Sequence, residues 1–382
     1  MLAAVAAAAL CLVSLLGVRL VAAGGPSGLV VAGEAFVHPD RPADLAVVNE
    51  GTGYDGQFVY RMTLDPFPDE PTAYGITLDN PPYRAQRVGL PLAAHALTRA
   101  GVPASVALIL VNVLALLGAT AAAAALARRW GRHALWGVVV GLSPALVISF
   151  TRDLTEPLAT ALLLAGLVAW PRRPVVAAAA FTAAVLTRET VLVVLAGLGL
   201  HALWQALRAR TPDTAPRRAA PRRAALARAA LLLVPLTAFV AWQAYLRSVW
   251  GEPAVAAAEG TGLGTPFLRP LSVLFAGADL TAWGSRDAVL ENVWLAERVA
   301  FLALLLHALW RVREVPALAA PLAAATLLAT STAWHRDVAF LRAGNEALVV
   351  ALLVLVAAGA RRPLAATAAA SAGVAVLYGA FL

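Results

Sequence analysis

The sequence predicts an all-α integral membrane protein, a polytopic bundle of about 11 transmembrane helices within a range of roughly 10 to 13. Three observations predict this class. The 382-residue chain is 60% hydrophobic and 14% charged, whereas soluble domains are nearer ~45–50% apolar and ~25% charged. Its mean hydropathy is +0.75. Its apolar stretches are long and unbroken, which indicates helices, because only helices and closed barrels satisfy the backbone within lipid.

Each expected span is an apolar run close to the length that crosses the hydrocarbon core, about 20 residues. The first, from Met1 to about Ala23, lacks the basic start of a signal peptide, so we interpret it as a retained helix. The expected spans are 2–23, 103–127, 134–151, 156–170, 175–187, 190–207, 229–248, 293–310, 315–333, 344–360 and 364–381.

Arginine clusters orient these spans. All 30 basic residues are Arg, and a cluster follows every even-numbered span. The clusters comprise Arg128, Arg129 and Arg132; Arg172 and Arg173; the basic loop 208–228; Arg311 and Arg313; and Arg361 and Arg362. Basic residues concentrate in cytoplasmic loops. The pattern therefore predicts a protein of the cell membrane with its N-terminus on the cytoplasmic side and its C-terminus on the outer side. Of the 22 acidic residues, only Asp213 and Glu314 then fall in cytoplasmic segments.

The chain is expected to form one membrane domain, residues 1–382, with two long outer segments at 24–102 and 249–292. This composition excludes a soluble enzyme. The Arg runs lie between apolar segments, which favours contact with membrane lipids over nucleic acid. The single cysteine, Cys11, leaves neither a disulfide framework nor a Cys-based metal site.

The stretch GYDGQFVYRMTLDPF, residues 53–67, lies within the first outer segment and carries an accessible carboxylate, Asp55. Gly56 lets the chain turn beside Asp55, and Phe58, Met62 and Phe67 would form the apolar side of a short interfacial helix. This helix would hold Asp55 at the membrane surface. An ordinary turn residue is the alternative interpretation of Asp55.

Three further clusters carry charges at the outer ends of helices, where ionisable groups are costly unless they are paired or functional. TRDLTEP, residues 151–157, supplies acids three apart that share a helix face. LTRET and WHRDVAFLR, residues 186–190 and 334–342, add cations suited to phosphate. Local ion pairs and a helix start are the structural alternatives. These clusters contribute Arg152, Asp153, Glu156, Arg188, Glu189, His335, Arg336, Asp337 and Arg342.

No metal-binding motif is present. The histidines are scattered, which argues against a His-based zinc site, and no HExxH, Walker or nucleophile-elbow sequence occurs. If a divalent cation such as Mg²⁺ or Mn²⁺ takes part, its ligands would be Asp55, Asp153 and Glu156.

The pattern resembles the GT-C superfamily of integral membrane glycosyltransferases, including lipid-linked mannosyltransferases of the GPI-assembly type. One helix precedes a long outer loop with Tyr54-Asp55-Gly56-Gln57 near its start. An aromatic, Arg-containing helix and the segment PPYRAQRVGLPL at 81–92 follow. Two more features complete the likeness: an acidic turn between spans three and four, with Asp153 and Glu156, and an arginine, Arg188, at the start of span six. The likeness covers the first half of the chain best. Gly56 follows Asp55 where many members carry a second acid, which leaves metal dependence open.

The resemblance implies transfer of a sugar from a polyprenyl-phosphate donor to a lipid, glycan or protein acceptor on the outer face of the membrane, with inversion. Asp55 would be the general base that deprotonates the acceptor hydroxyl. Arg188, Arg336 and Arg342 would stabilise the phosphate leaving group, and Asp153 and Glu156 would orient the sugar. The residues expected to bind the donor are Tyr54, Gln57, Tyr60, Arg61, Arg84, Arg87, Arg152, Asp153, Glu156, Arg188, Glu189, His335, Arg336 and Arg342.

Two other functions fit a chain of this composition. A secondary transporter or lipid flippase would carry its ionisable residues near the bilayer midplane on broken helices, usually in two repeated halves. A non-catalytic assembly protein of the cell envelope would tolerate substitutions at Asp55, Asp153 and Arg188. The enzyme hypothesis instead expects Asp55, Asp153, Arg188 and Arg336 to converge on one outer cavity.

Overall fold

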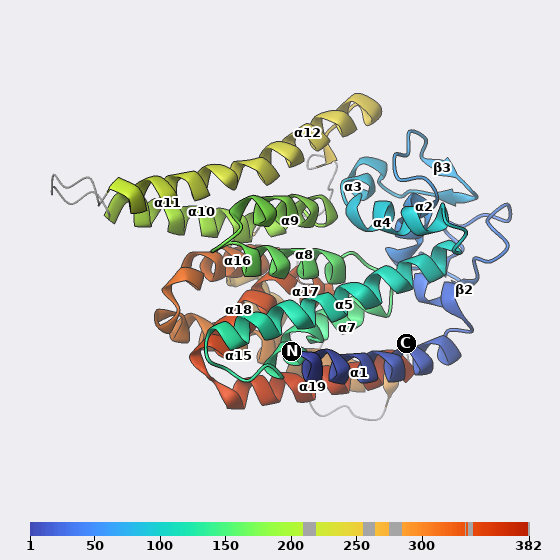
Figure 1. The fold of residues 1–382 in the computed structure, drawn as a ribbon. Coiled ribbons are helices and arrows are strands. Elements are labelled where there is room, and N and C mark those ends of the chain that lie inside the picture. The colour runs from blue at the N-terminus through green and yellow to red at the C-terminus, as the bar shows by residue number, and fades with distance from the viewer. Residues whose placement is uncertain (209–218, 255–263, 275–284, 333, 335–338, 381–382) are drawn as a thin grey trace.

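The structure is a computed structural model that describes residues 1–208, 219–254, 264–274, 285–332, 334 and 339–380. Long helices run alongside one another across the molecule, and the segment 24–102 forms a smaller cap at one end of them (Figure 1). Apart from four strands of two or three residues, the described secondary structure is helical. The expectation of an all-α protein is therefore confirmed.

Five described helices are long and apolar enough to cross a membrane. They comprise α1 (Leu2–Ala22), α5 (Ala104–Arg129), α10 (Val191–Arg208), the Arg223–Trp250 stretch of α11 (Ala219–Leu231) and α12 (Leu233–Trp250), and the Ala288–Glu314 stretch of α15 (Arg286–Arg311) and the short helix η3 (Val312–Glu314). Shorter apolar helices occupy four more expected spans, namely α8 (Glu156–Ala169), α9 (Pro174–Thr187), α16 (Ala319–Ser331) with η4 (Pro316–Leu318), and α18 (Asn345–Ala358). The protein is thus a membrane protein by length and composition of its helices, and the count of eleven spans stays a prediction.

The expected span 134–151 is wrong as a single helix. The structure has two short helices there, α6 (Trp136–Gly141) and α7 (Pro144–Phe150). Ser143 lies between them in an extended conformation, with φ −62° and ψ 155°. A residue before proline is pushed out of the helical region, and proline is well placed in the first turn of a new helix. Pro144 therefore ends one helix and starts the next.

The core of the helical layer is α18, whose residues are all buried. It packs against α15, α16 and α19 (Arg361–Ala380). Helix α8 contacts both α5 and α9, and α1 contacts both α5 and α19. Three arginines fix the ends of these helices on the side away from the cap. Arg132 and Arg311 donate to the last carbonyls of α18 at 3.0 and 2.8 Å, and Arg129 donates to Val168 of α8 at 2.8 Å. They satisfy carbonyls that a helix end leaves without a partner.

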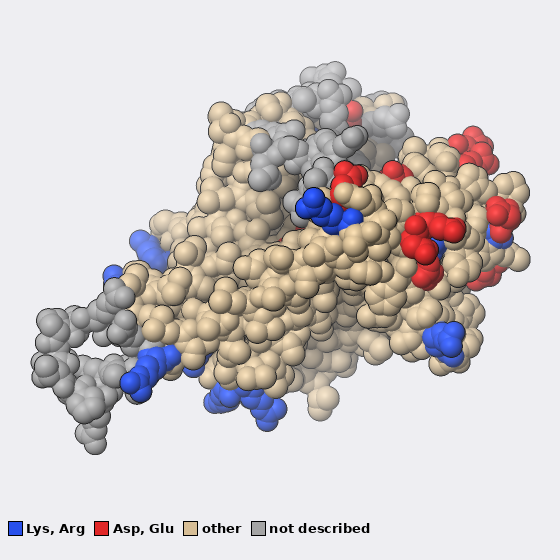
Figure 2. Space-filling view, turned by 90° about the horizontal axis from the view of Figure 1, so that it is seen from above, with Lys and Arg blue, Asp and Glu red and all other residues tan. Residues whose placement is uncertain are grey.

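The cap is built from short elements on the first turns of α5. Its helices are η1 (Pro26–Val30), α2 (Gly56–Leu64), α3 (Pro81–Ala85) and α4 (Gly89–Thr98), and its strands pair as β1 (Ala32–Gly33) with β2 (Val47–Asn49) and β3 (Thr72–Ala73) with β4 (Ile76–Thr77). The predicted helix after Asp55 is present as α2. A separate hydrophobic cluster that includes Val59, Tyr60, Leu90 and Leu108 joins the cap to α5. Acidic side chains gather at this end of the visible surface, as Figure 2 shows.

The remaining described helices are α14 (Leu268–Leu274) and α17 (Ala339–Ala343). Helix α14 belongs to the second outer segment and lies beside α15 and α16. Helix α17 directly precedes α18 and carries Arg342, so it brings the C-terminal half of the chain to the cap.

Candidate functional site

A tightly packed turn at residues 53–56 presents Asp55 at the start of α2. Gly53 has φ +65°, a conformation that glycine adopts at no steric cost. A β-carbon on Gly56 would lie 2.5 Å from the Arg152 carbonyl oxygen, so only glycine fits between α2 and the turn after α7. The Gln57 side chain accepts from the Gly33 N–H at 3.0 Å and donates to the Thr52 carbonyl at 2.7 Å. Gln57 thereby fixes the turn that carries Asp55.

Two arginines from distant segments hold the Asp55 carboxylate. Arg84 of α3 approaches Oδ1 at 2.9 Å, and Arg342 of α17 donates to Oδ2 at 3.1 Å. Arg342 also donates to the Tyr54 hydroxyl at 2.8 Å. Burial would raise the pKa of Asp55, but Arg342 and Arg84 outweigh it, so this pKa lies well below its usual range. Asp55 is therefore an ionised carboxylate with a guanidinium on each oxygen.

Arg342 continues the network into the interior. Its Nε donates to Oε1 of Glu156 at 3.0 Å, and the same oxygen accepts from Arg188 Nη1 at 2.6 Å. Glu156 is fully buried at the start of α8, and Arg188 lies at the end of α9. Arg188 also contacts Glu346 of α18 at 3.0 Å and donates to the Arg342 carbonyl at 2.7 Å. A buried carboxylate is tolerable only because it is paired in this way.

The result is an unbroken chain of alternating charges, which we call the ion-pair network. From the surface inward it consists of Asp79, Arg84, Asp55, Arg342, Glu156, Arg188 and Glu346. Its exposed end is Asp79, which takes two hydrogen bonds from Arg84 at 2.7 Å. Its inner end is Glu346, which is 3% exposed. The network joins five segments of the sequence, at 55, 79–84, 156, 188 and 342–346, from both halves of the chain.

A second ion pair stands beside the network. Arg87 donates two hydrogen bonds to Glu189, at 3.0 and 2.7 Å, and one to the Tyr83 hydroxyl at 3.0 Å. Burial would raise the pKa of Glu189, but Arg87 outweighs it and lowers this pKa to about 2. This pair joins the segment after α3 to the turn between α9 and α10.

A small cavity of about 20 Å³ lies at the middle of these charges. Asp55, Arg84, Arg87 and Arg342 contribute its polar lining, and Phe58, Val59, Met62, Leu154 and Thr155 contribute the rest. This volume is close to that needed for one water molecule. A group larger than a water molecule would need the guanidinium groups to move apart.

Some predicted residues lie elsewhere in the cap. The Tyr60 hydroxyl donates to Asp44 at 3.2 Å, and buried Arg61 pairs with Asp65 at 3.5 Å. The first contact joins α2 to the rest of the cap, and the second is local to the C-terminal end of α2. Arg152 lies over the Tyr54 ring at 4.4 Å, beside the network. His335, Arg336 and Asp337 lie outside the described residues.

Asp153 points to a different place, toward α1 and α5. It is fully buried with φ +50°, and Arg19 of α1 and Asn112 of α5 are near enough to act on it. Burial raises the pKa of Asp153 well above its usual range, against the smaller opposing effects of Asn112 and Arg19. Neither carboxylate oxygen makes a well-formed hydrogen bond to a described residue. Asp55, Arg188 and Glu156 thus converge, whereas Asp153 does not join them.

The carboxylates of the network are occupied by guanidinium groups. Among the described residues, no three His, Cys, Asp or Glu side chains are grouped to hold a metal ion. Asp55 and Glu156, two of the three carboxylates considered as ligands, face guanidinium groups instead. Mg²⁺ or Mn²⁺ would have to displace these guanidinium groups.

The sequence interpretation missed Asp79 and Glu346. Glu346 has a signal that could have identified it, because it is an acid at the start of an apolar span, four residues after Arg342. That spacing places both on one side of a helical stretch. Asp79 has no comparable signal, since acids are common in loops.

No family model matches the sequence, and no curated protein is similar to it.

Proposed function

We propose that the chain is a membrane glycosyltransferase of the GT-C type, which moves a sugar from a polyprenyl-phosphate donor to an acceptor at the cap. One observation carries the proposal. Asp55, Arg84, Glu156, Arg188 and Arg342, which the resemblance picks out from separate parts of the sequence, form one ion-pair network beside a cavity. A transporter site near the bilayer midplane would not need a network at the end of the helices.

The arginines supply what a phosphate leaving group requires. A guanidinium binds phosphate with two parallel hydrogen bonds, and Arg84, Arg87 and Arg342 all line the cavity. In the absence of substrate, Asp55 and Glu189 neutralise these cations. A phosphodiester would take over the hydrogen bonds that Arg84 and Arg342 make to Asp55.

The same exchange would prepare Asp55 for its role. While both guanidinium groups pair with Asp55, its low pKa makes it a weak base. Once they turn to the donor phosphate, Asp55 would accept the proton of the acceptor hydroxyl. The acceptor oxygen forms a bond to the anomeric carbon as the bond from that carbon to the phosphate oxygen breaks. The electron pair of that bond leaves with the polyprenyl phosphate, and one displacement inverts the anomeric centre.

The deeper part of the network would position the catalytic groups. Glu156 and Glu346 fix Arg188, and Glu156 also fixes the Nε of Arg342. Locking a guanidinium in its productive orientation before substrate binds lowers the cost of ordering it during the reaction.

The test is sugar transfer by the purified protein in lipid nanodiscs, with a radiolabelled sugar on a polyprenyl phosphate. Removing a general base typically costs ~10²–10⁴-fold in rate, so Asp55→Asn is expected to lose activity by that range. Asp65→Asn is the matched control, because Asp65 lies in the same cap, is similarly exposed and is also paired with an arginine. Asp55→Asn activity equal to that of Asp65→Asn would refute the proposed role.

A further inference from the structure

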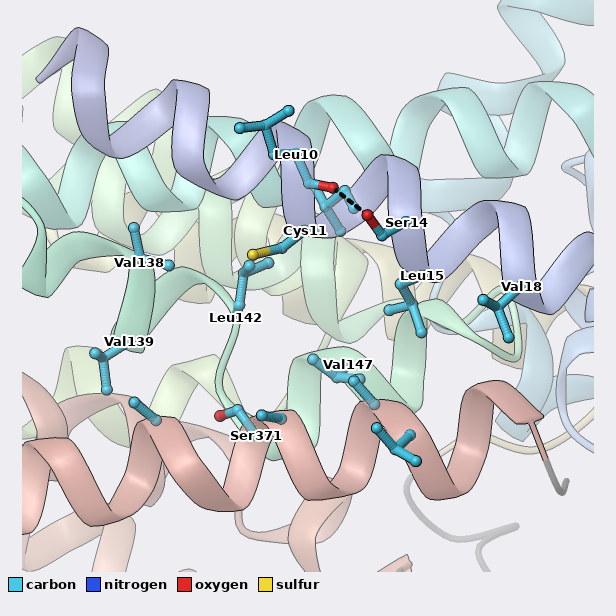
Figure 3. A pocket seen from close by; sticks show the side chains of 15 residues that line it. Leu10, Cys11, Ser14, Leu15, Val18, Val138, Val139, Leu142, Val147 and Ser371 are labelled. Carbon is cyan, nitrogen blue, oxygen red and sulfur yellow. Dashed lines mark hydrogen bonds between the residues drawn. The ribbon is translucent and has the colours of Figure 1, made fainter.

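A long apolar groove separates the first and last helices. Its volume is about 750 Å³, within the range of ~300–1,000 Å³ typical of ligand pockets. Figure 3 shows α1 and α19 on opposite sides, with the break between α6 and α7 behind them. The side chains that line it are Leu10, Cys11, Leu12, Ser14, Leu15, Val18, Val138, Val139, Leu142, Val147, Ala368, Ser371, Ala372, Ala375 and Val376.

Almost nothing polar in this groove is free to bind a ligand. The Ser14 hydroxyl donates to the Leu10 carbonyl at 3.0 Å, and the Ser371 hydroxyl donates to the Thr367 carbonyl at 3.0 Å. Both hydroxyls therefore serve their own helices. The groove fits a hydrocarbon chain.

One end of the groove leads to buried polar side chains. On α1 the buried stripe of Leu12 and Leu15 continues to Arg19, four residues after Leu15. On α7, which also lines the groove, Thr151 follows Val147 by four residues and begins the turn that contains Asp153. Four residues are about one helical turn. The groove-lining faces of α1 and α7 thus both change from apolar to polar at the same end.

The polar group at this end has unmet hydrogen-bonding capacity. Arg19, Asn112 and Asp153 are at most 5% exposed. The Nε of Arg19, both amide atoms of Asn112 and both carboxylate oxygens of Asp153 make no hydrogen bond of standard geometry among the described residues, although the Asn112 amide lies close enough to Asp153 to lower its pKa. Buried polar groups in native proteins are normally satisfied. A ligand that supplied the missing partners would be stabilised accordingly.

The chemistry of these atoms selects the ligand's head. Arg19 donates, the Asn112 amide donates and accepts, and Asp153 presents two oxygens. Hydroxyl groups can both donate and accept, so a neutral sugar can match all three side chains. A phosphate only accepts, and it would leave the oxygens of Asn112 and Asp153 unmatched.

We propose that the groove between α1 and α19, together with Arg19, Asn112 and Asp153, binds a glycolipid: its hydrocarbon chain fills the groove and its neutral sugar head meets the three polar side chains. Within the proposed function, on which this step rests, the glycolipid is the acceptor. Asp153 follows Arg152, whose carbonyl packs on Gly56 and whose guanidinium lies over Tyr54. The head site and the ion-pair network therefore share the turn 151–155.

Cys11 provides a direct test in the unmodified protein, because it is the chain's single cysteine and lines the groove. The measurement is the rate of Cys11 alkylation by N-ethylmaleimide, with the protein held in amphipol and incubated with decyl β-glucoside or with decyl phosphate. At about ten times its dissociation constant, the glucoside should slow alkylation roughly tenfold. Decyl phosphate should have little effect at the same concentration. Equal protection by both would overturn the proposal, since any amphiphile would then fill the groove.

Three variants locate the site. Ala372→Trp would fill the groove, and Ala369→Trp is its control, because Ala369 is an exposed residue of the same helix outside the lining. We expect the first to abolish glucoside binding, measured by equilibrium dialysis with labelled glucoside, and the second to retain it. Asn112→Leu removes buried polar atoms without partners, so it should leave the melting temperature unchanged or higher while weakening glucoside binding at least tenfold. Retained binding in Asn112→Leu or Ala372→Trp would overturn the proposal.

The outcomes separate this inference from the proposed function. Protection of Cys11 by the glucoside without sugar transfer in any assay would refute the transferase and leave the glycolipid site standing. Transfer to a glycolipid with full activity in Asn112→Leu and Ala372→Trp would keep the transferase and overturn the site.

Discussion

At the scale of single residues, Glu156 is the most constrained charge in the network. It is fully buried, and one of its oxygens accepts from both Arg188 and Arg342. Removing one member of a buried ion pair leaves an uncompensated charge, which is more damaging than the pair is stabilising. Glu156 therefore matters for stability as well as for the orientation of two arginines.

We predict that Glu156→Gln destabilises the protein by about 3–5 kcal/mol, because two buried guanidinium groups lose their shared carboxylate. The measurement is denaturant unfolding in detergent micelles. The control is Glu314→Gln, which removes the exposed partner of Arg311 and should cost about 1 kcal/mol or less. Similar losses for the two variants would show that Glu156 is not stabilised by its buried pairs.

The Arg87–Glu189 pair predicts a pH dependence of stability. The pKa of Glu189 is about 2 in the folded protein, against about 4.3 in an unfolded chain. Because the folded pKa is the lower one, this pair stabilises the protein fully above about pH 4.3 and loses its contribution as the pH falls toward 2. The Glu189→Gln variant should lack this component, so its melting temperature should approach that of the wild type as the pH falls through this window. A difference that stays constant down to pH 2 would contradict the assignment.

How far the sequence predicts individual residues depends on how many contacts fix them. Asp55, Glu156, Arg188 and Arg342 were identifiable because each is a charge at the end of an apolar run. The sequence does not predict that the side chain of Asp153, three residues before Glu156, points toward α1 and α5 instead of the network. That direction depends on its left-handed backbone conformation and on the position of α1 and α5, which no local pattern records.

At the scale of elements, the break between α6 and α7 shows where hydropathy alone fails. The stretch 134–151 is apolar throughout, so its composition favours one span, yet Pro144 divides it. Long helices such as α5 were predicted within a few residues of their ends. Interfacial α2 was also predicted, but Phe67, assigned to its apolar side, lies beyond its end and is half exposed.

Helix α6 packs on α5 too closely for a side chain at Gly137. A β-carbon there would lie 2.6 Å from the backbone nitrogen of Ala124, so Gly137→Ala should destabilise the protein by about 1–3 kcal/mol through overpacking. Gly17 of α1 has no atom within 4 Å of that position. Gly17→Ala should therefore be neutral or stabilising by up to about 1 kcal/mol. Thermal unfolding of the two variants would show whether α5 and α6 approach as described, and a harmless Gly137→Ala would contradict this packing.

At the scale of the whole molecule, charge is divided between the two ends. Acids gather on the cap, while arginines at the opposite end donate to the last carbonyls of α8 and α18. The arginines of these clusters therefore cap the C-terminal ends of helices, in addition to indicating the orientation of the chain. The sequence alone did not reveal this second role. The orientation itself follows from the positive-inside rule and gives the cap a predicted place outside the cytoplasm.

Labelling of introduced cysteines tests that orientation. In a Cys11→Ser background, Glu70→Cys places a thiol on the exposed cap, and Pro171→Cys places one on the exposed turn after α8. A membrane-impermeant maleimide should label the first in intact cells and the second only after permeabilisation. The reverse order would place the ion-pair network on the cytoplasmic side.

The most direct test of the account is the position of a bound donor in an experimental structure of Asp55→Asn with a polyprenyl-phosphate-linked sugar. The account predicts phosphate oxygens at about 2.7–2.9 Å from guanidinium nitrogens of Arg84 and Arg342, with the anomeric carbon facing residue 55. A donor phosphate bound elsewhere, with Arg84 and Arg342 still on the side chain of residue 55, would contradict the claim that the ion-pair network is the active site.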